Sequence, residues 1–195
     1  MLLGLVACGM AEDEQDDRNR SIYLTFDDER FMAFCLDRYD LNGDGRFSRY
    51  EAERIVEMDC SGQLIRFLDD IDEFAHLERL DCSDNELVRL NVEDCTELRT
   101  LNCSRNALTD LRLKNLRVLT ELNCSENRLS QLELQTNGIL RLLEAQGNRL
   151  VMLDVAPCAG NLKANVRANP LLETVYYRPG QQIDFESPTT LIERE

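Results

Sequence analysis

The sequence predicts a solenoid of short parallel strands, preceded by a small helix–loop–helix module. Two observations predict this fold class. Asparagine recurs every 21 residues from residue 85 to residue 169, inside one repeated apolar frame. A 12-residue loop rich in side-chain oxygens, at 40–51, stands ahead of the repeats. A fixed period of this length is typical of stacked repeats, in which each unit buries its apolar face only against its neighbours.

The apolar pattern inside each repeat predicts a short strand. Four units read LERLDCSDNELVRLNV, LRTLNCSRNALTDLRL, LTELNCSENRLSQLEL and LRLLEAQGNRLVMLDV. Apolar residues alternate before each asparagine, so they share one face of a short strand. An asparagine amide both donates and accepts, so we expect a ladder of asparagines to satisfy backbone groups inside the turns. A unit of 21 residues leaves little room for a return helix, so the opposite side is expected to be extended or 3₁₀.

The frame L-x-x-L-x-C/L-x-x-N-x-L-x-x-L, over about residues 64–177, resembles the leucine-rich-repeat family. The resemblance implies an α/β-type solenoid with short parallel strands on a concave face and a mostly non-helical convex side. It also implies a role in binding a partner. The unit around Asn169 departs from the frame, because Asn161 and Ala164 replace its leading leucines, as expected of a terminal cap. Leu171 is expected to follow Asn169 as the leucines of earlier units follow theirs.

Residues between the apolar positions are expected to face outward from the concave sheet in two polar rows. The first row is Asp81, Asn102, Asn123, Glu144 and Asn165, and the second is Ser83, Ser104, Ser125, Gln146 and Arg167. Two interpretations remain open: a platform for a protein or glycan partner, or a solvated face that only keeps the solenoid soluble. Neither row contains an aromatic residue, whereas tight protein interfaces usually use Trp, Tyr or Arg anchors.

The segment DLNGDGRFSRYE, residues 40–51, resembles the EF-hand calcium loop at every diagnostic position. The resemblance implies a bound Ca²⁺, with Arg46 contributing its carbonyl, Ser48 acting through a water and Glu51 binding through both oxygens. Phe47 would normally pair with a second loop, and no second loop is present in the sequence. We therefore expect a structural ion rather than a switch. The implied ligands are Asp40, Asn42, Asp44, Arg46, Ser48 and Glu51.

Helices are expected on both sides of this loop. Thr25 or Asp27 is predicted to cap the entering helix. Ser48 and Glu51 have the spacing of a capping box, which predicts the start of the exit helix. Gly62 is the expected end of that helix.

The first residues, Leu5-Val6-Ala7-Cys8, resemble a bacterial lipobox, in which the cysteine becomes the lipidated first residue. The acidic segment 11–20 that follows is expected to be a disordered tether. It resembles the export signal of surface-displayed lipoproteins. The resemblance implies an outer-membrane lipoprotein, either periplasmic or facing outward. A basic n-region is missing before the lipobox. A mis-assigned start at Met1, a truncated signal and an ordinary apolar N-terminus therefore all remain open.

The other seven cysteines form no CxxC pair, and the single histidine, His76, is far from any metal-type cluster. Cys82, Cys103 and Cys124 occupy inward strand positions, where free cysteine behaves as a small hydrophobe. No G-x-S-x-G, P-loop, G-x-G-x-x-G or H-E-x-x-H motif occurs. We therefore predict that the chain is not an enzyme.

The formal net charge is −15, with 19 acidic and 8 basic residues in 1–75 against 18 and 14 in 76–195. This balance argues against nucleic-acid binding, which needs clustered Lys and Arg, and against adsorption to anionic lipid.

The sequence is thus divided into a signal, an acidic tether, an EF-hand-like module, the repeats with an N-terminal cap, and a C-terminal cap and tail. The boundaries are 1–7, 8–20, 21–62, 63–177 and 178–195. We predict a non-catalytic, lipid-anchored surface module that binds a protein or glycan partner. The alternative is a structural or assembly component of an outer-membrane complex, which docks through its calcium module.

Overall fold

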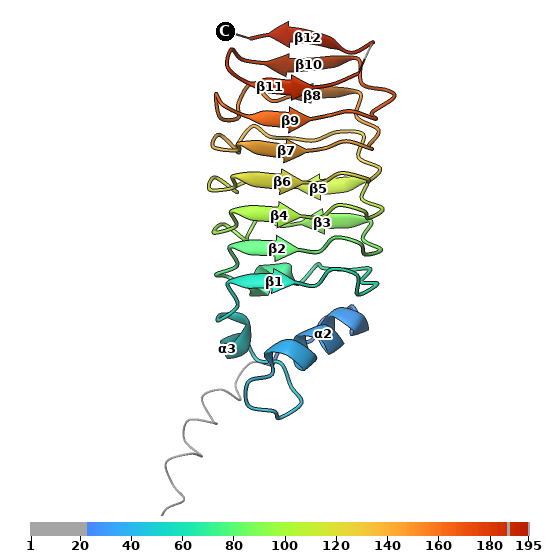
Figure 1. The fold of residues 1–195 in the computed structure, drawn as a ribbon. Helices are drawn as coiled ribbons and strands as arrows, with labels where there is room; N and C mark the ends of the chain where they lie inside the picture. The colour runs from blue at the N-terminus through green and yellow to red at the C-terminus, as the bar shows by residue number, and fades with distance from the viewer. Residues whose placement is uncertain (1–22, 187, 195) are drawn as a thin grey trace, which may run out of the picture.

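A computed structural model describes residues 23–186 and 188–194, in which the chain winds into a stack of coils on a short helical base (Figure 1). The base contains α2 (Glu29–Tyr39) and the single-turn α3 (Arg49–Ala52). The first coil also contains the 3₁₀ turn η1 (Ile71–Glu73). Cys8 and the acidic tether lie outside the described residues.

One side of every coil contributes a strand to a seven-stranded, fully parallel sheet, which we call the long sheet. Neighbouring strands pair in register, so Leu80, Leu101 and Leu122 lie side by side. Its strands are, in spatial order, β1 (Glu57–Asp59), β2 (Arg79–Asp81), β4 (Thr100–Asn102), β6 (Glu121–Asn123), β7 (Leu142–Glu144), β9 (Lys163–Asn165) and β11 (Gln182–Asp184).

The return side of the coils also contains strands, which we call the second sheet. It consists of two separate parallel pieces. The first piece is β3 (Arg89–Asn91) with β5 (Asp110–Arg112), and the second is β8 (Met152–Asp154), β10 (Thr174–Tyr177) and β12 (Thr190–Glu193). Within the described residues this side has no α-helix, in agreement with the short repeat. A parallel-strand solenoid is therefore confirmed.

The core runs through the middle of the stack between the two sheets. The repeated leucines are buried, and the inward position directly after each of the first five strands of the long sheet is filled by a small side chain. Cys60 stands at the base of this stack, although its sequence context had placed it in the helical module. The stacked residues are Cys60, Cys82, Cys103, Cys124 and Ala145.

Each asparagine of the 21-residue ladder ties two coils together. The Asn127 Nδ2 donates to the Cys103 carbonyl at 3.0 Å in the preceding coil, and to the Cys124 and Ser125 carbonyls at 3.1 and 3.2 Å in its own. Its Oδ1 accepts from the Leu108 N–H at 2.9 Å. Asn85, Asn106, Asn148 and Asn169 bond in the same way. The predicted role of the ladder is confirmed.

Asp28, rather than Asp27 or Thr25, caps α2, so the predicted N-cap is wrong. The Asp28 Oδ1 accepts from the Arg30 and Phe31 N–H groups at 2.9 and 3.1 Å. Its Oδ2 accepts from the Arg66 and Phe67 N–H groups of the first coil at 2.6 and 3.1 Å. The same carboxylate therefore caps the helix and fastens it to the solenoid.

Aromatic packing joins the base to the stack. Phe26 stacks on Phe31 with ring centroids 4.9 Å apart, and Phe47 stacks on Phe74 at 5.9 Å. Phe31, Phe47 and Phe74 are almost fully buried. Aromatic pairs at these distances contribute about 0.5–1.5 kcal/mol beyond their burial. The base and the first coil thus share one core.

Two expected boundaries are different in the structure. The exit helix α3 ends at Ala52, and β1 already pairs with β2, so the solenoid begins inside the segment 21–62 that was assigned to the EF-hand-like module. Gly62, with φ of +66°, lies in the turn after β1 and does not end a helix. The short exit helix is explained by β1, since residues 57–59 gain a partner strand that a longer helix would lose.

The C-terminal end also differs. Leu171 is 56% exposed, and Leu172 is buried in its place, because the last repeat is one residue longer here. The segment 178–195, which was assigned to a C-terminal cap and tail, contains β12, which pairs with β10 along its whole length. The strands β11 and β12 extend the long sheet and the second sheet respectively.

Candidate functional site

The outward face of the seven-stranded long sheet is a regular surface that runs along the stack. In β2, β4, β6, β7 and β9 the middle residue is buried and its two neighbours are exposed or half-buried. One outward row is the predicted one, extended at both ends. It is Asp59, Asp81, Asn102, Asn123, Glu144, Asn165 and Asp184.

The second predicted row is not a surface row. Ser83, Ser104 and Ser125 are buried, with 6–7% of each residue exposed, so their prediction as outward platform residues is wrong. The Ser125 Oγ donates to the Asn123 Oδ1 at 2.7 Å, and its own N–H donates to the same atom at 3.1 Å. These serines hold the first row in place and are largely shielded from solvent. Gln146 is half-buried and Arg167 is exposed at the same repeat position.

The outward row that sequence reasoning missed lies two residues before the predicted one. Its position follows from strand alternation, because residues i and i+2 lie on the same face. The row comprises Glu57, Arg79, Thr100, Glu121, Leu142, Lys163 and Gln182. Together the two rows define what we call the long-sheet face.

Hydrogen bonds between coils order part of this face and leave its centre free. The Asn102 Nδ2 donates to the Asp81 Oδ2 at 2.8 Å, and the Asn165 Nδ2 donates to the Glu144 Oε2 at 3.0 Å. Within the described residues, the amide nitrogen of Asn123 has no hydrogen-bond partner. The middle of the face therefore offers an exposed donor between two fixed pairs.

A hollow of about 410 Å³ lies where the end of α2 meets the first strands of the long sheet. Arg38 and Tyr39 from α2 line it opposite Asp59 and Asp81. The hydroxyl of Ser61, its N–H group and, more weakly, the charge of Arg38 hold the pKa of Asp59 below its usual value, against the opposing effect of burial. Asp59 thus stays ionised at neutral pH.

The long-sheet face is acidic overall. It carries six carboxylates and two cations. One of the cations, Arg79, forms an ion pair with Glu57. The carboxylates are Glu57, Asp59, Asp81, Glu121, Glu144 and Asp184, and the second cation is Lys163. A surface of this charge favours a basic or polar partner.

The predicted calcium loop has the turn geometry that such a loop needs. The Asp40 Oδ1 and Oδ2 accept from the N–H groups of Gly43 at 2.7 Å and Gly45 at 2.9 Å. Gly45, at the sixth position, has a φ of +74°, as its place in the motif requires. The Glu51 Oε1 accepts from the Leu41 N–H at 2.8 Å, so this carboxylate reaches back to the start of the loop.

The second carboxylate oxygen of Glu51 completes the predicted capping box. It accepts from the Ser48 N–H at 2.8 Å, and the Ser48 Oγ in turn accepts from the Glu51 N–H at 3.4 Å. Within residues 23–186 and 188–194, no three His, Cys, Asp or Glu side chains are gathered closely enough to hold a metal ion. The calcium ligands Asp40, Asn42, Asp44, Arg46, Ser48 and Glu51 therefore stay a prediction.

The partner for Phe47, which the sequence did not reveal, is the segment that precedes α2. The Leu24 N–H donates to the Phe47 carbonyl at 2.8 Å, and Tyr23 forms an antiparallel bridge with Ser48. The Tyr23 hydroxyl also donates to the Asp44 Oδ2 at 3.3 Å, and its ring lies 4.9 Å from the Arg46 guanidinium. No sequence motif announced this pairing.

The cysteines in the described residues are all free and buried. Burial raises the pKa of Cys60 and Cys124 to about 12 and that of Cys82 and Cys103 well above its usual value. Thiols of this kind are neutral and unreactive at physiological pH. Their expected role as small core residues agrees with the structure.

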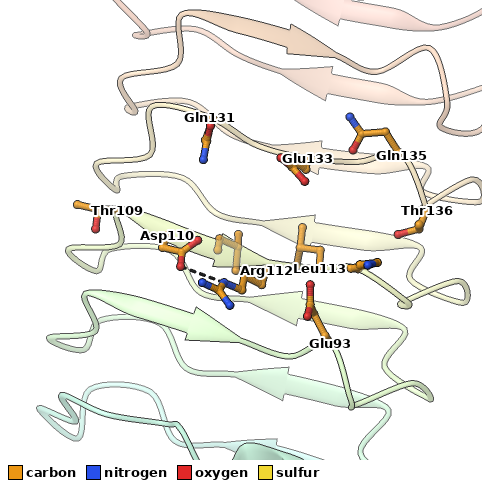
Figure 2. Close-up of a pocket in the computed structure, with 11 residues that line it drawn as sticks. Glu93, Thr109, Asp110, Arg112, Leu113, Gln131, Glu133, Gln135 and Thr136 are labelled. Carbon is orange, nitrogen blue, oxygen red and sulfur yellow. Dashed lines mark hydrogen bonds and ion pairs between the residues drawn. The ribbon is translucent and has the colours of Figure 1, made fainter.

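The return side holds a further cavity, which no sequence pattern indicated. Its volume is about 590 Å³, and it lies between β5 and the segment 130–136 (Figure 2). Asp110, Arg112 and Glu133 contribute charged groups to its walls.

His76 lies on the surface, where its Nδ1 is 3.3 Å from the Glu97 Oε1 and both side chains are at least half exposed. No helix of the described chain is long and apolar enough to cross a membrane.

Comparison with protein-family models and with curated proteins finds no match. Solved structures do match. The functional domain of InlJ from Listeria monocytogenes, described as including a cysteine ladder, is 25% identical with a TM-score of 0.70 over 81% of this chain and 37% of that one. The internalin InlF from the same organism is 20% identical with a TM-score of 0.63, over 81% of this chain and 51% of that one.

The chain thus spans less than two thirds of either neighbour. The internalins are leucine-rich-repeat proteins, and the likeness shows that this fold is a solenoid of the leucine-rich-repeat type.

Proposed function

We propose that this protein is a non-catalytic binding module whose long-sheet face engages a protein partner. The observation that carries the proposal is the seven-stranded outward face, with its two ordered polar rows and the hollow beside Tyr39. The likeness to internalins supports an interaction role. The open, polar surface also favours binding over catalysis, because nothing there desolvates a reacting group.

The face favours a basic protein surface over a glycan. Six carboxylates against two cations attract positively charged partners. Sugar-binding sites commonly rely on aromatic rings, and Tyr39 is the one aromatic side chain that lines the hollow. Arg38 and Tyr39 supply the types of residue that anchor protein interfaces.

Site-specific photo-crosslinking tests this function. A photoreactive amino acid replaces Asn123 at the centre of the long-sheet face, and in the control it replaces Asn91 on the second sheet. We expect one protein to crosslink in intact cells from position 123 and not from position 91. The charge reversal Glu121→Lys should abolish that crosslink. Equal labelling from both positions, or none from position 123, would contradict the proposal.

Calcium is the second part of the proposal. The residues fit the ion chemically, because Ca²⁺ prefers carboxylate, amide and carbonyl oxygens. Asp40, Asn42, Asp44 and Glu51 would supply side-chain oxygens, the Arg46 carbonyl would add one, and Ser48 would act through a water. The ion would neutralise the carboxylates of the loop and stiffen the base of the stack. Phe47 of the loop stacks on Phe74 of the first coil, which supports a link between ion binding and the rigidity of the base.

The third part concerns location. Cys8 would carry the lipid anchor, with segment 8–20 as a tether and the protein displayed on the outer membrane. These residues lie outside those that the structure describes, and the support comes from the sequence alone. Metabolic labelling with an alkyne-tagged fatty acid tests it, with Cys8→Ala as the variant that should lose the label.

An alternative function is supported by a specific observation on the base. Leu41 is 65% exposed and Tyr50 is 43% exposed on the two ends of the calcium loop. An assembly component would dock through this surface and use the repeats as a spacer. A photoreactive residue at position 41 that captures a partner, while position 123 captures none, would favour this alternative.

A further inference from the structure

The second sheet is interrupted at one coil of the stack. The segments 89–91, 110–112, 152–154, 174–177 and 190–193 are strands, whereas 131–133 is not. Among the described residues, no strand pairing and no main-chain hydrogen bond connects segment 130–136 to β5 or to β8. The strand pairing that joins β3 to β5, and β8 to β10 and β12, is therefore missing on both sides of that segment.

A cavity of about 590 Å³ opens at this interruption (Figure 2). Every residue of the run 109–114 contributes to one wall, inward and outward positions alike. The other wall contains Gln131, Glu133, Gln135 and Thr136. A wall made of consecutive residues exposes its main chain, so the free edge of β5 forms this side of the cavity.

The orientation of the peptide groups agrees with this interpretation. The Arg112 carbonyl accepts from the Val92 N–H at 3.2 Å, so it faces β3. The Leu113 carbonyl accepts from the Asn137 Nδ2 at 3.2 Å, so it faces the next coil. Main-chain groups of successive strand residues point to opposite edges. The N–H and carbonyl of Leu111 therefore face the cavity, where no strand pairs with them.

We propose that this cavity is a strand-accepting slot, in which an extended peptide from a partner protein pairs with the free edge of β5. A free strand edge is a ready template for such pairing. Leu111 at the floor of the slot is 8% exposed, whereas Leu90 in the paired strand β3 is 2% exposed. The inward side chains of the peptide would be apolar, in contact with Leu111.

The outward side chains of the bound peptide would be polar. They would lie between Asp110 and Arg112, which form an ion pair at 3.1 Å, and Gln131 and Glu133 across the slot. No aromatic ring lines the cavity. Sugars prefer such rings, so the main-chain wall favours a peptide. At its other edge β5 already pairs with β3, in which Arg89, Leu90 and Asn91 are in register with it. The sequence of β3 is therefore a suitable probe for the free edge.

The test uses a synthetic peptide with the sequence of residues 88–93, VRLNVE, titrated into the full chain and followed by amide NMR. We expect the signals of residues 110–113 and 131–135 to shift in a saturable manner. The same peptide with Leu90→Pro should bind at least about tenfold more weakly, because proline removes a donor from the added strand.

A blocking variant of the protein localises the effect. Gln131→Trp places an indole in the slot and should abolish the shifts, whereas Asn91→Trp on the paired strand β3 is the matched control and should preserve them. Shifts that persist in Gln131→Trp, or that occur only at the edges of β11 and β12, would overturn the proposal. So would the absence of saturable binding, or binding of chitohexaose at this site in place of the peptide.

Discussion

Leu24 donates its N–H to the carbonyl of Phe47 at 2.8 Å, and this single bond places the segment before α2 where a second EF-hand loop would pair. Tyr23 extends the contact through Asp44 and Arg46. The loop at 40–51 therefore pairs with a segment of its own chain. An ion in the loop would be linked to the N-terminal segment as well as to the first coil.

This arrangement predicts the effect of Glu51→Gln. Glutamine retains the capping box but loses the charge and the two-oxygen contact that calcium needs. We expect calcium affinity, measured by calorimetry, to fall at least about tenfold. The melting temperature in chelator should stay close to that of the wild type. Glu53→Gln, on the exposed side next to α3, is the control, and equal calcium affinity in all three proteins would refute the assignment.

Tyr23 gives a second prediction for the same loop. Terbium occupies oxygen-rich calcium sites, and a nearby tyrosine ring excites its emission. Tyr23→Phe should reduce terbium emission on excitation at tyrosine wavelengths, because the Tyr23 ring packs against the loop at Arg46. Tyr177→Phe, in β10 at the other end of the stack, serves as the control. If terbium binds and Tyr23→Phe leaves its emission unchanged, the contact between Tyr23 and the loop is not formed in solution.

Asp28 predicts a specific acid sensitivity. Burial raises the pKa of this carboxyl, but four backbone N–H groups outweigh burial and hold it below its ordinary value of 3.8. The ionised form is therefore favoured in the folded state. Its contribution to stability is present above the unfolded value and is lost as the pH falls through the lower folded value.

Asp28→Asn should accordingly destabilise the protein at pH 7 by about 1–3 kcal/mol, since one oxygen is replaced by a donor that faces N–H groups. Its unfolding free energy should depend less on pH below 4 than that of the wild type. Asp27→Asn, one residue earlier, is the matched control. Identical denaturant midpoints for wild type and Asp28→Asn would show that the carboxylate does not fasten α2 to the first coil.

The asparagine ladder predicts a large effect from a small change. Asn127→Ala removes four hydrogen bonds that join two coils. The three carbonyls each keep another donor, whereas the buried Leu108 N–H loses its partner. Removing a buried partner costs about 1–3 kcal/mol for each group left unsatisfied, and we expect a total loss of about 3 kcal/mol by urea unfolding. Glu121→Ala on the same coil is exposed and should change stability by less than about 0.5 kcal/mol. A similar loss in both variants would show that the ladder adds nothing specific.

The stacked cysteines predict slow reaction with alkylating reagents. Because burial raises the pKa of Cys124 to about 12, its thiol should react with iodoacetamide at pH 8 only after unfolding. Cys124→Ala should fold, since Ala145 fills the same position one coil later. Rapid modification of Cys124 in the native protein, detected by mass spectrometry, would contradict the packed core.

Several elements follow from local sequence patterns. The positions of Leu80, Leu101 and Leu122 identify strands, because alternating apolar residues bury one face wherever they occur. The capping box of Ser48 and Glu51 is likewise a short-range signal. By contrast, the prediction that Ser83, Ser104 and Ser125 face solvent failed. The prediction assumed that inward and outward side chains keep alternating past the end of the strand. The chain turns there, and each serine hydroxyl donates to the side chain two residues earlier.

The sequence by itself determined the period of the coils, the buried leucines and the inward amides of the ladder, since these depend on a pattern that recurs every 21 residues. The tertiary structure decided the rest: the pairing of Leu24 with Phe47, the double role of Asp28, and the open slot beside Leu111. These features join residues far apart in the sequence, such as Leu24 with Phe47 and Asp28 with Arg66, or depend on how two neighbouring coils stack. Such contacts arise only when the coils are stacked, because stacking determines which main-chain groups find a partner and which stay free.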